Sequence, residues 1–275
     1  MINILKRGIN SNVLKTIALI AMVIDHIGFY FSPVLPNPIY TIFRYIGRIA
    51  MPIFVYLLVQ GFFHTKNFNK YIIRLGIFAF ITQILITVLM IINIKLLLDY
   101  TAAKQIYTTG NILFTFVLSL ITLKLLHENI LIKKWDYNKN LSLKIISVVV
   151  IVIGSILLPI DYGIEVIILS ILFYYIEKFK IQVYLDKAKD NVSVKKLLLN
   201  NISDEKIKAI YISLLLFAML TLVIWFNAHL TILLAIIPIA LYNNERGKIQ
   251  LKYVYYITFP LQHVILYLIA MLTLT

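Results

Sequence analysis

Long apolar runs, separated by short polar turns, set the pattern of this chain. A membrane-spanning helix needs about 20 mostly apolar residues, within a range of about 17–25. Nine runs approach that length, at residues 14–32, 40–63, 71–93, 109–126, 143–160, 161–178, 209–226, 228–242 and 252–273. The pattern predicts an all-α, polytopic transmembrane protein of about nine spans. The range is eight to ten spans, because only a turn at 159–163 separates the fifth and sixth runs and the eighth run is short.

Composition supports the membrane class. Hydrophobic residues make up 61% of the chain and charged residues 14%, and the mean hydropathy is +0.91. Soluble domains are about one quarter charged. We therefore predict a single integral membrane domain over residues 1–275. Its first run carries Asp25-His26 and lacks a small-residue cleavage site, so we expect it to be retained as a span.

The basic residues predict the orientation of the spans. They cluster before the first span, between the second and third, between the fourth and fifth, in a loop at about 178–208, and before the last span. On the other side of the membrane only Lys95 and Lys104 are expected. Because cytoplasmic loops are enriched in Lys and Arg, the N-terminus is predicted to be cytoplasmic. The loop at 178–208 is then the main cytoplasmic connection, and Lys180 is expected within it.

The same charge bias narrows the possible partners. A net charge of +14 is explained by cytoplasmic loops that face anionic lipid, so we expect membrane lipids and no nucleic acid as partners. The chain has no cysteine and only five scattered histidines. This composition excludes disulfides and Cys-ligated metal centres, and we predict no metal site.

Four charged or titratable side chains lie deep inside the first two apolar runs, beyond Lys15 at the edge of the first. Asp25 and His26 are in the first, and Arg44 and Arg48 are in the second. Charged side chains within a membrane are costly and usually face one another or a polar cavity. Arg44 and Arg48 share a helical face, and the short connection makes the two helices neighbours at matching depth. We predict a cluster of all four residues in the outer half of the membrane.

Such a cluster suits more than one task. His26 could act as a general base for an amine or hydroxyl, and the arginines could bind a phosphate, a carboxylate or a developing oxyanion. Adjacent helical residues point about 100° apart, so Asp25 could pair with Arg44 or Arg48 instead of His26. The alternative is a buried charge network that only fixes helix packing.

The residues in this region resemble the TraX family, named for the membrane protein that N-acetylates the F-type conjugative pilin subunit. Three segments carry the specific part of the resemblance. The first runs from Leu14-Lys15 through Met22 to Asp25-His26-Ile27-Gly28, and the second runs from Arg44 through Gly47-Arg48-Ile49-Ala50 to Pro52-Ile53-Phe54. The third runs from Gly61-Phe62-Phe63-His64-Thr65 through Asn67 and Lys70-Tyr71 to Arg74-Leu75. Weaker similarities follow in the same order, at Gly110-Asn111, Asp161-Tyr162-Gly163 and Tyr242-Asn243-Asn244-Glu245-Arg246-Gly247.

The resemblance implies a multi-pass acyltransferase of the bacterial cell membrane that uses acetyl-CoA as acyl donor. His26 would be the base, with Asp25, Arg44 and Arg48 in the catalytic group. The wider acyltransferase-3 group has a basic residue at the spacing that separates Lys15 from His26, so Lys15 would meet the CoA phosphates. His64 and Arg74 could also meet them, although both could simply reach the membrane interface. The acceptor would be a peptide N-terminus, a glycan or a lipid-linked amine or hydroxyl.

Three further positions are second-tier candidates. The family tends to carry a Tyr-Pro-x-His pattern in its last span, whereas this chain has Gln262 at that position and His263 one residue later. Gln83 and Asn111 could line a cavity, but hydrogen bonding between helices is the favoured interpretation. Asp161 and His229 are expected in water-exposed loops.

Two other functions use the same residues. A transporter or flippase would use the cluster of Asp25, His26, Arg44 and Arg48 as a proton or anion relay. Inverted repeats or paired broken helices would favour it, and the sequence shows neither clearly. A non-catalytic membrane scaffold would need the cluster for stability alone.

Overall fold

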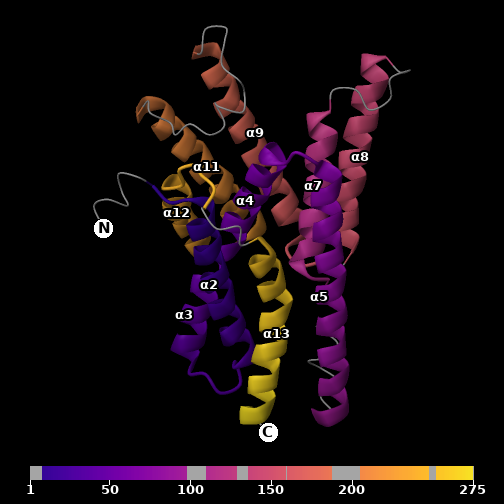
Figure 1. Ribbon diagram of the computed structural model, residues 1–275, viewed down its shortest axis with the longest axis vertical. Helices are drawn as coiled ribbons and strands as arrows, with labels where there is room; N and C mark the ends of the chain where they lie inside the picture. Colours follow the sequence, from indigo (N-terminus) through magenta and orange to yellow (C-terminus); the bar gives the residue numbers. More distant parts are fainter. Residues whose placement is uncertain are drawn as a thin grey trace. The chain divides into compact units, whose positions relative to one another are not determined.

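The computed structural model describes residues 8–97, 110–128, 136–158, 160–187, 205–247 and 252–274 (Figure 1). Within these ranges the chain is helical, and strand-like pairing is limited to two isolated bridges, between Ile9 and Tyr242 and between Gly110 and Ile160. The predicted all-α class is confirmed for this part of the chain.

The helices follow one another with short connections. Their bounds are α2 Ser11–Tyr30, α3 Asn37–Gly47, α4 Ala50–His64, α5 Phe68–Leu97, α7 Ile112–His127, α8 Tyr137–Leu157, α9 Gly163–Lys187, α11 Glu205–Phe226, η1 Leu230–Ala235, α12 Ile236–Ala240 and α13 Lys252–Leu274. Polar side chains begin several of them. Asn10, Asn111 and Asp136 each accept a hydrogen bond from a backbone N–H of the first turn that has no partner inside the helix.

Six stretches of the described residues are long and apolar enough to cross a membrane. They are Ser11–Tyr30, Asn37–His64, Phe68–Leu89, Tyr137–Leu157, Glu205–Phe226 and Tyr253–Thr273. Their outward faces carry large apolar side chains, such as Phe80 at 64% exposed, Val150 at 61% and Trp225 at 82%. Such surface is unfavourable in water and suits lipid. The chain is a multi-pass membrane protein, while the count of nine spans and the side of the N-terminus stay predictions.

The second predicted span is broken within the structure. α3 ends at Gly47, a turn follows at Arg48 and Ile49, and α4 begins at Ala50. Pro52 accounts for the break, because its ring would clash with the carbonyl of Arg48, four residues earlier, in a continuous helix. Arg44 therefore lies in α3, and Arg48 lies at the turn.

Two other elements differ from their predicted bounds. The helix expected at 161–178 continues to Lys187, so the predicted loop at 178–208 begins later; its residues 188–204 lie outside the described ranges. Lys180, expected in that loop, is a buried helical residue instead. The run at 228–242 forms the 3₁₀ helix η1 and the single-turn helix α12, with Pro238 in the short helix.

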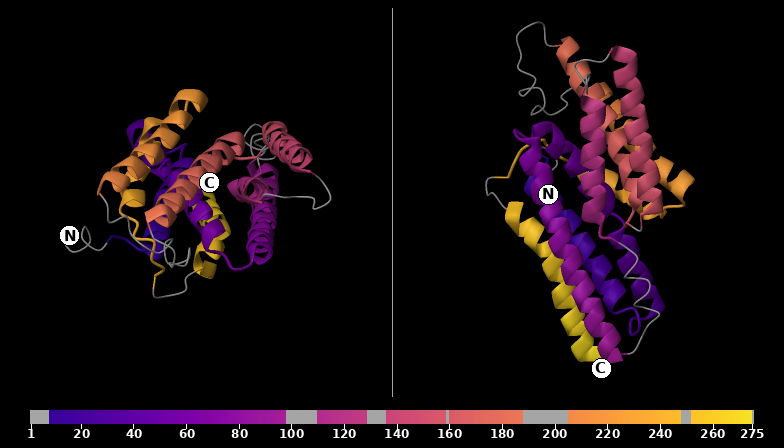
Figure 2. Two further views of the ribbon diagram at one scale, coloured as in Figure 1. Left: turned by 90° about the horizontal axis from the view of Figure 1, so that it is seen from above. Right: turned by 90° about the vertical axis from the view of Figure 1, so that its right-hand side faces the viewer.

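The contacts group the chain into two compact units. The first comprises residues 1–57, 172–255 and 270–275, and the second comprises 58–171 and 256–269. In the first unit α2 packs along α3 (Figure 2). The interior of this unit includes Leu14 of α2, Tyr56 of α4, Phe173 of α9 and Leu215 of α11.

The second unit has its own apolar interior. α7 packs against α5 and against α8 (Figure 1). Leu120 of α7, Ala79 of α5 and Ile167 of α9 are fully buried. Asp161 and Gly110 connect the ends of two helices, because the Asp161 N–H donates to the Gly110 carbonyl at 2.8 Å.

Candidate functional site

An ion pair joins α2 to α3 in the first unit. The Nη1 of Arg44 donates to the Oδ2 of Asp25 at 2.8 Å and lies 3.4 Å from the Asp25 carbonyl oxygen. The two side chains are 22% and 18% exposed. The sequence left His26, Arg44 and Arg48 open as partners of Asp25, and in the structure Asp25 pairs with Arg44. The pair is shielded but still reachable, as a ligand site requires.

Two glycines allow this close approach. A Cβ on Gly47 would lie 2.2 Å from the Cβ of Asp25, and a Cβ on Gly28 would lie 3.0 Å from the Cβ of Phe43 and 3.6 Å from the Cδ of Arg44. Each helix therefore presents a glycine opposite the ion-paired residue of the other helix. The contact between α2 and α3 is shaped around the Asp25–Arg44 pair.

Arg48 and His26 complete the cluster. Arg48 caps α3 one turn after Arg44, and its positive charge acts on the Asp25 carboxylate. His26 follows Asp25 on α2, and its Nδ1 is buried. Two guanidinium groups thus act on the one carboxylate of Asp25.

Lys15 lies at a separate position on the first unit. It precedes Asp25 by ten residues, which is about 15 Å along a helix. Its Nζ lies 5.6 Å from the centre of the Tyr255 ring, and the neighbouring Thr16 hydroxyl is 3.1 Å from the Tyr255 hydroxyl. The structure therefore separates the predicted donor-binding lysine from the predicted base by most of a helix.

The second unit holds the other predicted donor-binding residues. The Nδ1 of His64 lies 2.7 Å from the Gln60 carbonyl oxygen. Arg74 lies beside two aromatic rings, with its guanidinium carbon 5.9 Å from the centre of Tyr71 and 5.4 Å from that of Tyr256.

The second-tier residues all lie in the second unit. The Gln83 side-chain oxygen accepts from the backbone N–H of Asn111 at 2.9 Å and from its side chain at 3.1 Å, which links α5 to the start of α7. His263 is 9% exposed and meets the ring of Phe259. Gln262 is buried, and neither polar atom of its amide has a hydrogen-bond partner among the described residues.

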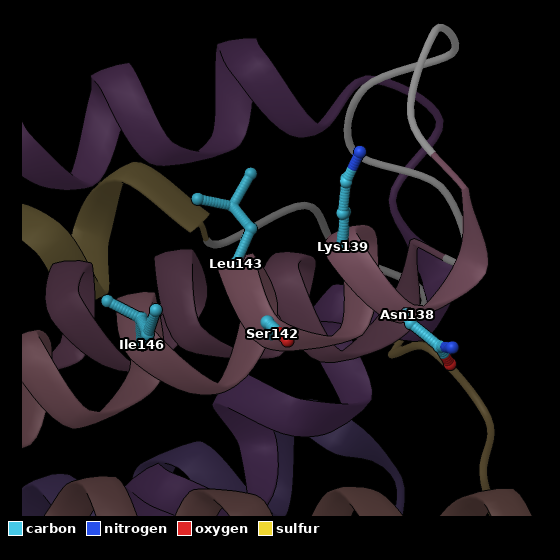
Figure 3. A pocket seen from close by; sticks show the side chains of 5 residues that line it. All are labelled: Asn138, Lys139, Ser142, Leu143 and Ile146. Carbon is cyan, nitrogen blue, oxygen red and sulfur yellow. The ribbon is translucent and has the colours of Figure 1, made fainter.

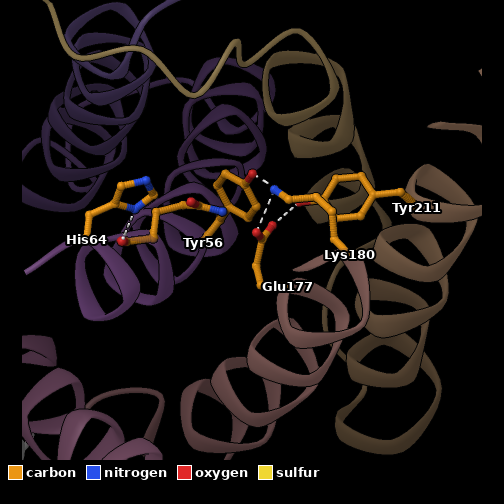
Figure 4. Close-up of polar contacts among 6 residues, drawn as sticks. Tyr56, His64, Glu177, Lys180 and Tyr211 are labelled. Atoms are coloured by element: carbon orange, nitrogen blue, oxygen red, sulfur yellow. Dashed lines mark hydrogen bonds and ion pairs between the residues drawn. The ribbon is translucent and has the colours of Figure 1, made fainter. Parts of the chain in front are cut away.

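A second ion pair, inside the first unit, was not predicted. Lys180 and Glu177 lie one turn apart on α9, with Nζ and Oε2 at 2.6 Å, and they are 3% and 0% exposed (Figure 4). Tyr211 donates a short hydrogen bond to the other Glu177 oxygen, and the Tyr56 hydroxyl is 3.1 Å from that of Tyr211. A glutamate and a lysine three residues apart at the end of an apolar run were the signal available in the sequence.

An open hollow on α8 carries little chemistry. It has a volume of about 560 Å³ and is lined by Asn138, Lys139, Ser142, Leu143 and Ile146 (Figure 3). None of the predicted site residues lines it. Among the described residues no group of three or more His, Asp or Glu side chains could hold a metal ion.

The fold and the site define a class: a multi-pass α-helical membrane protein with a partly accessible charged cluster between two adjacent helices. The family described as TraX protein matches residues 10–270, almost the whole chain. The chain belongs to the TraX family, which confirms the resemblance carried by the Asp25-His26 and Arg44-to-Phe54 segments.

Two relatives are similar over part of their length. A probable fimbrial assembly protein, FimC of serogroup H1 from Dichelobacter nodosus, is 36% identical over 110 residues, which cover 40% of this chain and 43% of that protein. The uncharacterized protein RP591 of Rickettsia prowazekii (strain Madrid E) is 45% identical over 78 residues, or 28% of this chain and 27% of that protein. The matched parts are thus less than half of either relative. No solved structure matches the chain.

Proposed function

We propose that this protein is a membrane-embedded acyltransferase that moves an acetyl group from acetyl-CoA to an amine or hydroxyl. The observation that carries the proposal is the α2–α3 site of a TraX family member. There Asp25 and Arg44 form a partly accessible ion pair, Arg48 adds a second positive charge, and His26 is the next residue along α2. A base next to a positively charged anion site is what acyl transfer needs.

The reaction assigns one task to each group. The nitrogen or oxygen of the acceptor attacks the thioester carbonyl carbon, so that a new C–N or C–O bond forms and the C–S bond breaks. His26 takes the proton that the acceptor loses, and the departing CoA thiolate receives a proton and leaves as the thiol. The positive charge of the site stabilises the oxyanion of the tetrahedral intermediate.

The two arginines have different roles in this proposal. Arg44 is held by Asp25 through a charge-assisted hydrogen bond, so it positions α3 against α2. Arg48 lies at the turn between α3 and α4, and in this proposal its guanidinium group stabilises the incoming negative charge. Asp25 holds Arg44 directly and attracts Arg48 through its charge.

The acceptor is proposed from the relatives and from the family. One relative is named a probable fimbrial assembly protein, and the resemblance to the TraX family implies modification of a pilin subunit. A peptide N-terminal amine, as on a surface fibre subunit, is therefore the first acceptor to test, followed by glycan and lipid-linked amines or hydroxyls. In this proposal the N-terminus is cytoplasmic, so acetyl-CoA arrives from the side of the basic loops.

The test is acetyl transfer by the purified full-length protein. We would supply acetyl-CoA with a panel of peptide amines in lipid nanodiscs and measure release of free CoA thiol. His26→Gln is expected to lower the rate by about 10²–10⁴-fold, the usual contribution of a general base. His127→Gln is the matched control, because His127 lies on the exposed part of α7 and outside the cluster.

Two outcomes would overturn the proposal. Folded wild-type protein that neither binds acetyl-CoA nor consumes its thioester would exclude the acetyl-CoA mechanism. Wild-type protein that instead moves an anion or protons across the vesicle membrane, with the flux abolished by His26→Gln, would identify a transporter.

A further inference from the structure

Arg74 lies inside an apolar span of the second unit. It is six residues beyond Phe68, where α5 begins, which is about 9 Å along a helix. The sequence left two roles for Arg74, a contact with the phosphates of CoA and a side chain that reaches the membrane interface. A side chain of the second kind keeps its charged end in water. The surroundings of Arg74 distinguish a held guanidinium group from a free one.

Two tyrosine rings hold the guanidinium group of Arg74. Its carbon lies 5.9 Å from the centre of Tyr71, one turn earlier on α5, and 5.4 Å from the centre of Tyr256 on α13. Residue 256 also belongs to the second unit. The Tyr256 ring is stacked on Phe78 at 4.9 Å with an interplanar angle of 17°, so it is itself fixed. A cation within about 6 Å of a ring is attracted to its face, and Arg74 is therefore held in place.

The hydroxyl of Tyr71 is positioned by a glycine of α4. A Cβ on Gly61 would lie only 2.8 Å from this hydroxyl oxygen, so the hydroxyl fits there because residue 61 has no side chain. Arg74 and Tyr256 both act electrostatically on Tyr71. One guanidinium group and two phenol hydroxyls, from α5 and α13, thus lie within range of one another.

The guanidinium group of Arg74 has no carboxylate partner in the described part of the chain. The ion pairs found there do not include Arg74. Its Nε is buried and donates no hydrogen bond within the described residues, whereas the side chain as a whole is half-buried. Aromatic faces attract the cation but offer no acceptor in the plane of its N–H groups. A buried donor without an acceptor is costly, so the site suits an anion that accepts these hydrogen bonds.

We propose that Arg74, Tyr71 and Tyr256 form a binding site for a phosphate group. A guanidinium group presents a planar fork of N–H donors that matches phosphate oxygens, and the two hydroxyls supply further donors. Because the rings already hold Arg74, little side-chain freedom is lost when the anion binds. The sequence singled out Arg74 alone, and the two tyrosines are the new members of the site.

Two molecules offer this chemistry: the phosphates of acyl-CoA and the headgroup phosphate of an anionic lipid. The assignment to acyl-CoA rests on the proposed function, whereas the phosphate site itself does not. In the acyl-CoA case the site binds the nucleotide end of the donor and has no part in the chemical step.

The experiment compares two donors that share a thioester and differ in phosphate. Binding of acetyl-CoA and of S-acetylpantetheine, which has no phosphate, is measured by calorimetry on the full-length protein in neutral-lipid nanodiscs. Arg74→Gln is expected to weaken acetyl-CoA binding by about tenfold or more, the effect of losing a hydrogen bond to a charged group. Tyr256→Phe keeps the ring and removes the hydroxyl, so a loss of about threefold is expected. Binding of S-acetylpantetheine should stay unchanged in both.

Two further variants test whether the held guanidinium group matters. Arg74→Lys keeps the charge and loses the planar fork, so its affinity for acetyl-CoA should stay below that of the wild type. Lys70→Gln is the matched control, because Lys70 is an exposed lysine one turn before Arg74 on α5. Equal losses in Lys70→Gln and Arg74→Gln would overturn the site, because they would show a diffuse effect of positive charge.

A second arm separates the two sources of phosphate. The same proteins are placed in nanodiscs with anionic phosphatidylglycerol, and bound lipid is counted by native mass spectrometry. If Arg74→Gln loses bound anionic lipid and keeps its affinity for acetyl-CoA, the phosphate site holds and belongs to lipid. If it loses affinity for acetyl-CoA in neutral lipid, the site belongs to the donor.

Failure of this site is distinguishable from failure of the proposed function. Wild-type acetyl transfer with the same KM for acetyl-CoA in Arg74→Gln, and unchanged lipid binding, would overturn the phosphate site and leave the acyltransferase intact. Equal losses with acetyl-CoA and S-acetylpantetheine would also overturn it, because they would show a general effect on folding. Phosphate-dependent binding without any acetyl transfer would keep the site and overturn the enzyme.

Discussion

The first unit contains two ion pairs that are built differently. Asp25 and Arg44 come from different helices and are 18% and 22% exposed. Glu177 and Lys180 lie on one turn of α9 and are 0% and 3% exposed. Both place charge in an apolar environment, where an unpaired charge is costly. Of the two pairs, only the first is partly exposed.

The charges that surround the two ion pairs also differ. At the α2–α3 site Arg48 adds a second cation to one carboxylate, so an anion would be attracted. At α9 the charges are balanced, and both oxygens of Glu177 are occupied, one by Tyr211 and one by Lys180. We infer that the α2–α3 pair serves a ligand and that the α9 pair holds α4, α9 and α11 together.

The largest expected effect on stability is at the α9 pair. Lys180→Met removes the cation and leaves the Glu177 carboxylate buried, which typically costs about 3–5 kcal/mol. We expect a large fall in thermal stability in detergent, measured by the unfolding of purified protein. Acetyl transfer per folded molecule should change little.

Lys178→Met is the matched control for this change. Lys178 lies next to Glu177 on the exposed face of α9, so its loss should change stability by less than about 0.5 kcal/mol. A Lys180→Met protein as stable as Lys178→Met would show that the α9 pair does not hold the unit together.

The second prediction concerns the α2–α3 pair, where a substitution should lower activity more than stability. Asp25→Asn removes the charge that positions Arg44 and Arg48 but keeps a hydrogen-bond acceptor, so the loss of stability should be about 1.5–3 kcal/mol or less. Transfer activity, measured as CoA thiol release, should fall far more than it does in Lys180→Met. Activity that survives Asp25→Asn would argue against a catalytic role for the α2–α3 site.

The class of the protein and much of its charged site could be predicted from the sequence. Apolar runs and composition are properties of the chain itself, and the all-helical membrane class followed from them. The pairing of Asp25 with an arginine was also accessible, because a short connection forces two neighbouring helices together. The choice of Arg44 over Arg48 was not, since it depends on the break at Arg48 and Ile49 that Pro52 introduces.

The α9 network could not be predicted because it depends on tertiary packing. Tyr56 and Tyr211 are 155 residues apart in sequence and meet only when α4 and α11 pack on α9. The pattern of apolar residues in the sequence does not predict a contact between side chains of such distant helices. Lys180 was predicted to lie in a loop because basic residues of membrane proteins usually lie in loops. Here Lys180 is buried in α9 instead, where it pairs with the buried Glu177.

The third prediction tests the shape of the α2–α3 contact. Gly47→Ala places a methyl group where only 2.2 Å separates it from the Cβ of Asp25, so α3 has to move away from α2. Overpacking of this kind costs about 1–3 kcal/mol, and the displaced Arg44 should lower activity as well. Thermal unfolding and CoA release measure the two effects.

Gly154→Ala is the control for that substitution. Gly154 lies within α8 with no atom within 4 Å of an added Cβ. Alanine is favoured over glycine in a helix by about 1 kcal/mol, so this protein should be as stable as the wild type or slightly more stable. Equal losses in both variants would show that Gly47 is an ordinary helical glycine.

The smallest effect is expected when both members of the α9 pair are replaced together. Glu177→Gln combined with Lys180→Met removes both charges and keeps a hydrogen-bonding group near Tyr211. Replacing a buried ion pair by uncharged residues of similar volume is often neutral or stabilising. The double variant should therefore regain most of the stability lost in Lys180→Met, with unchanged acetyl transfer.

The corresponding double change at the α2–α3 pair is Asp25→Asn with Arg44→Met. Activity should stay lost in this variant even if stability returns, because a ligand site needs its charge and a packing contact does not. If the α9 double variant also loses activity while folded, Glu177 takes part in function and the distinction between the two pairs is wrong.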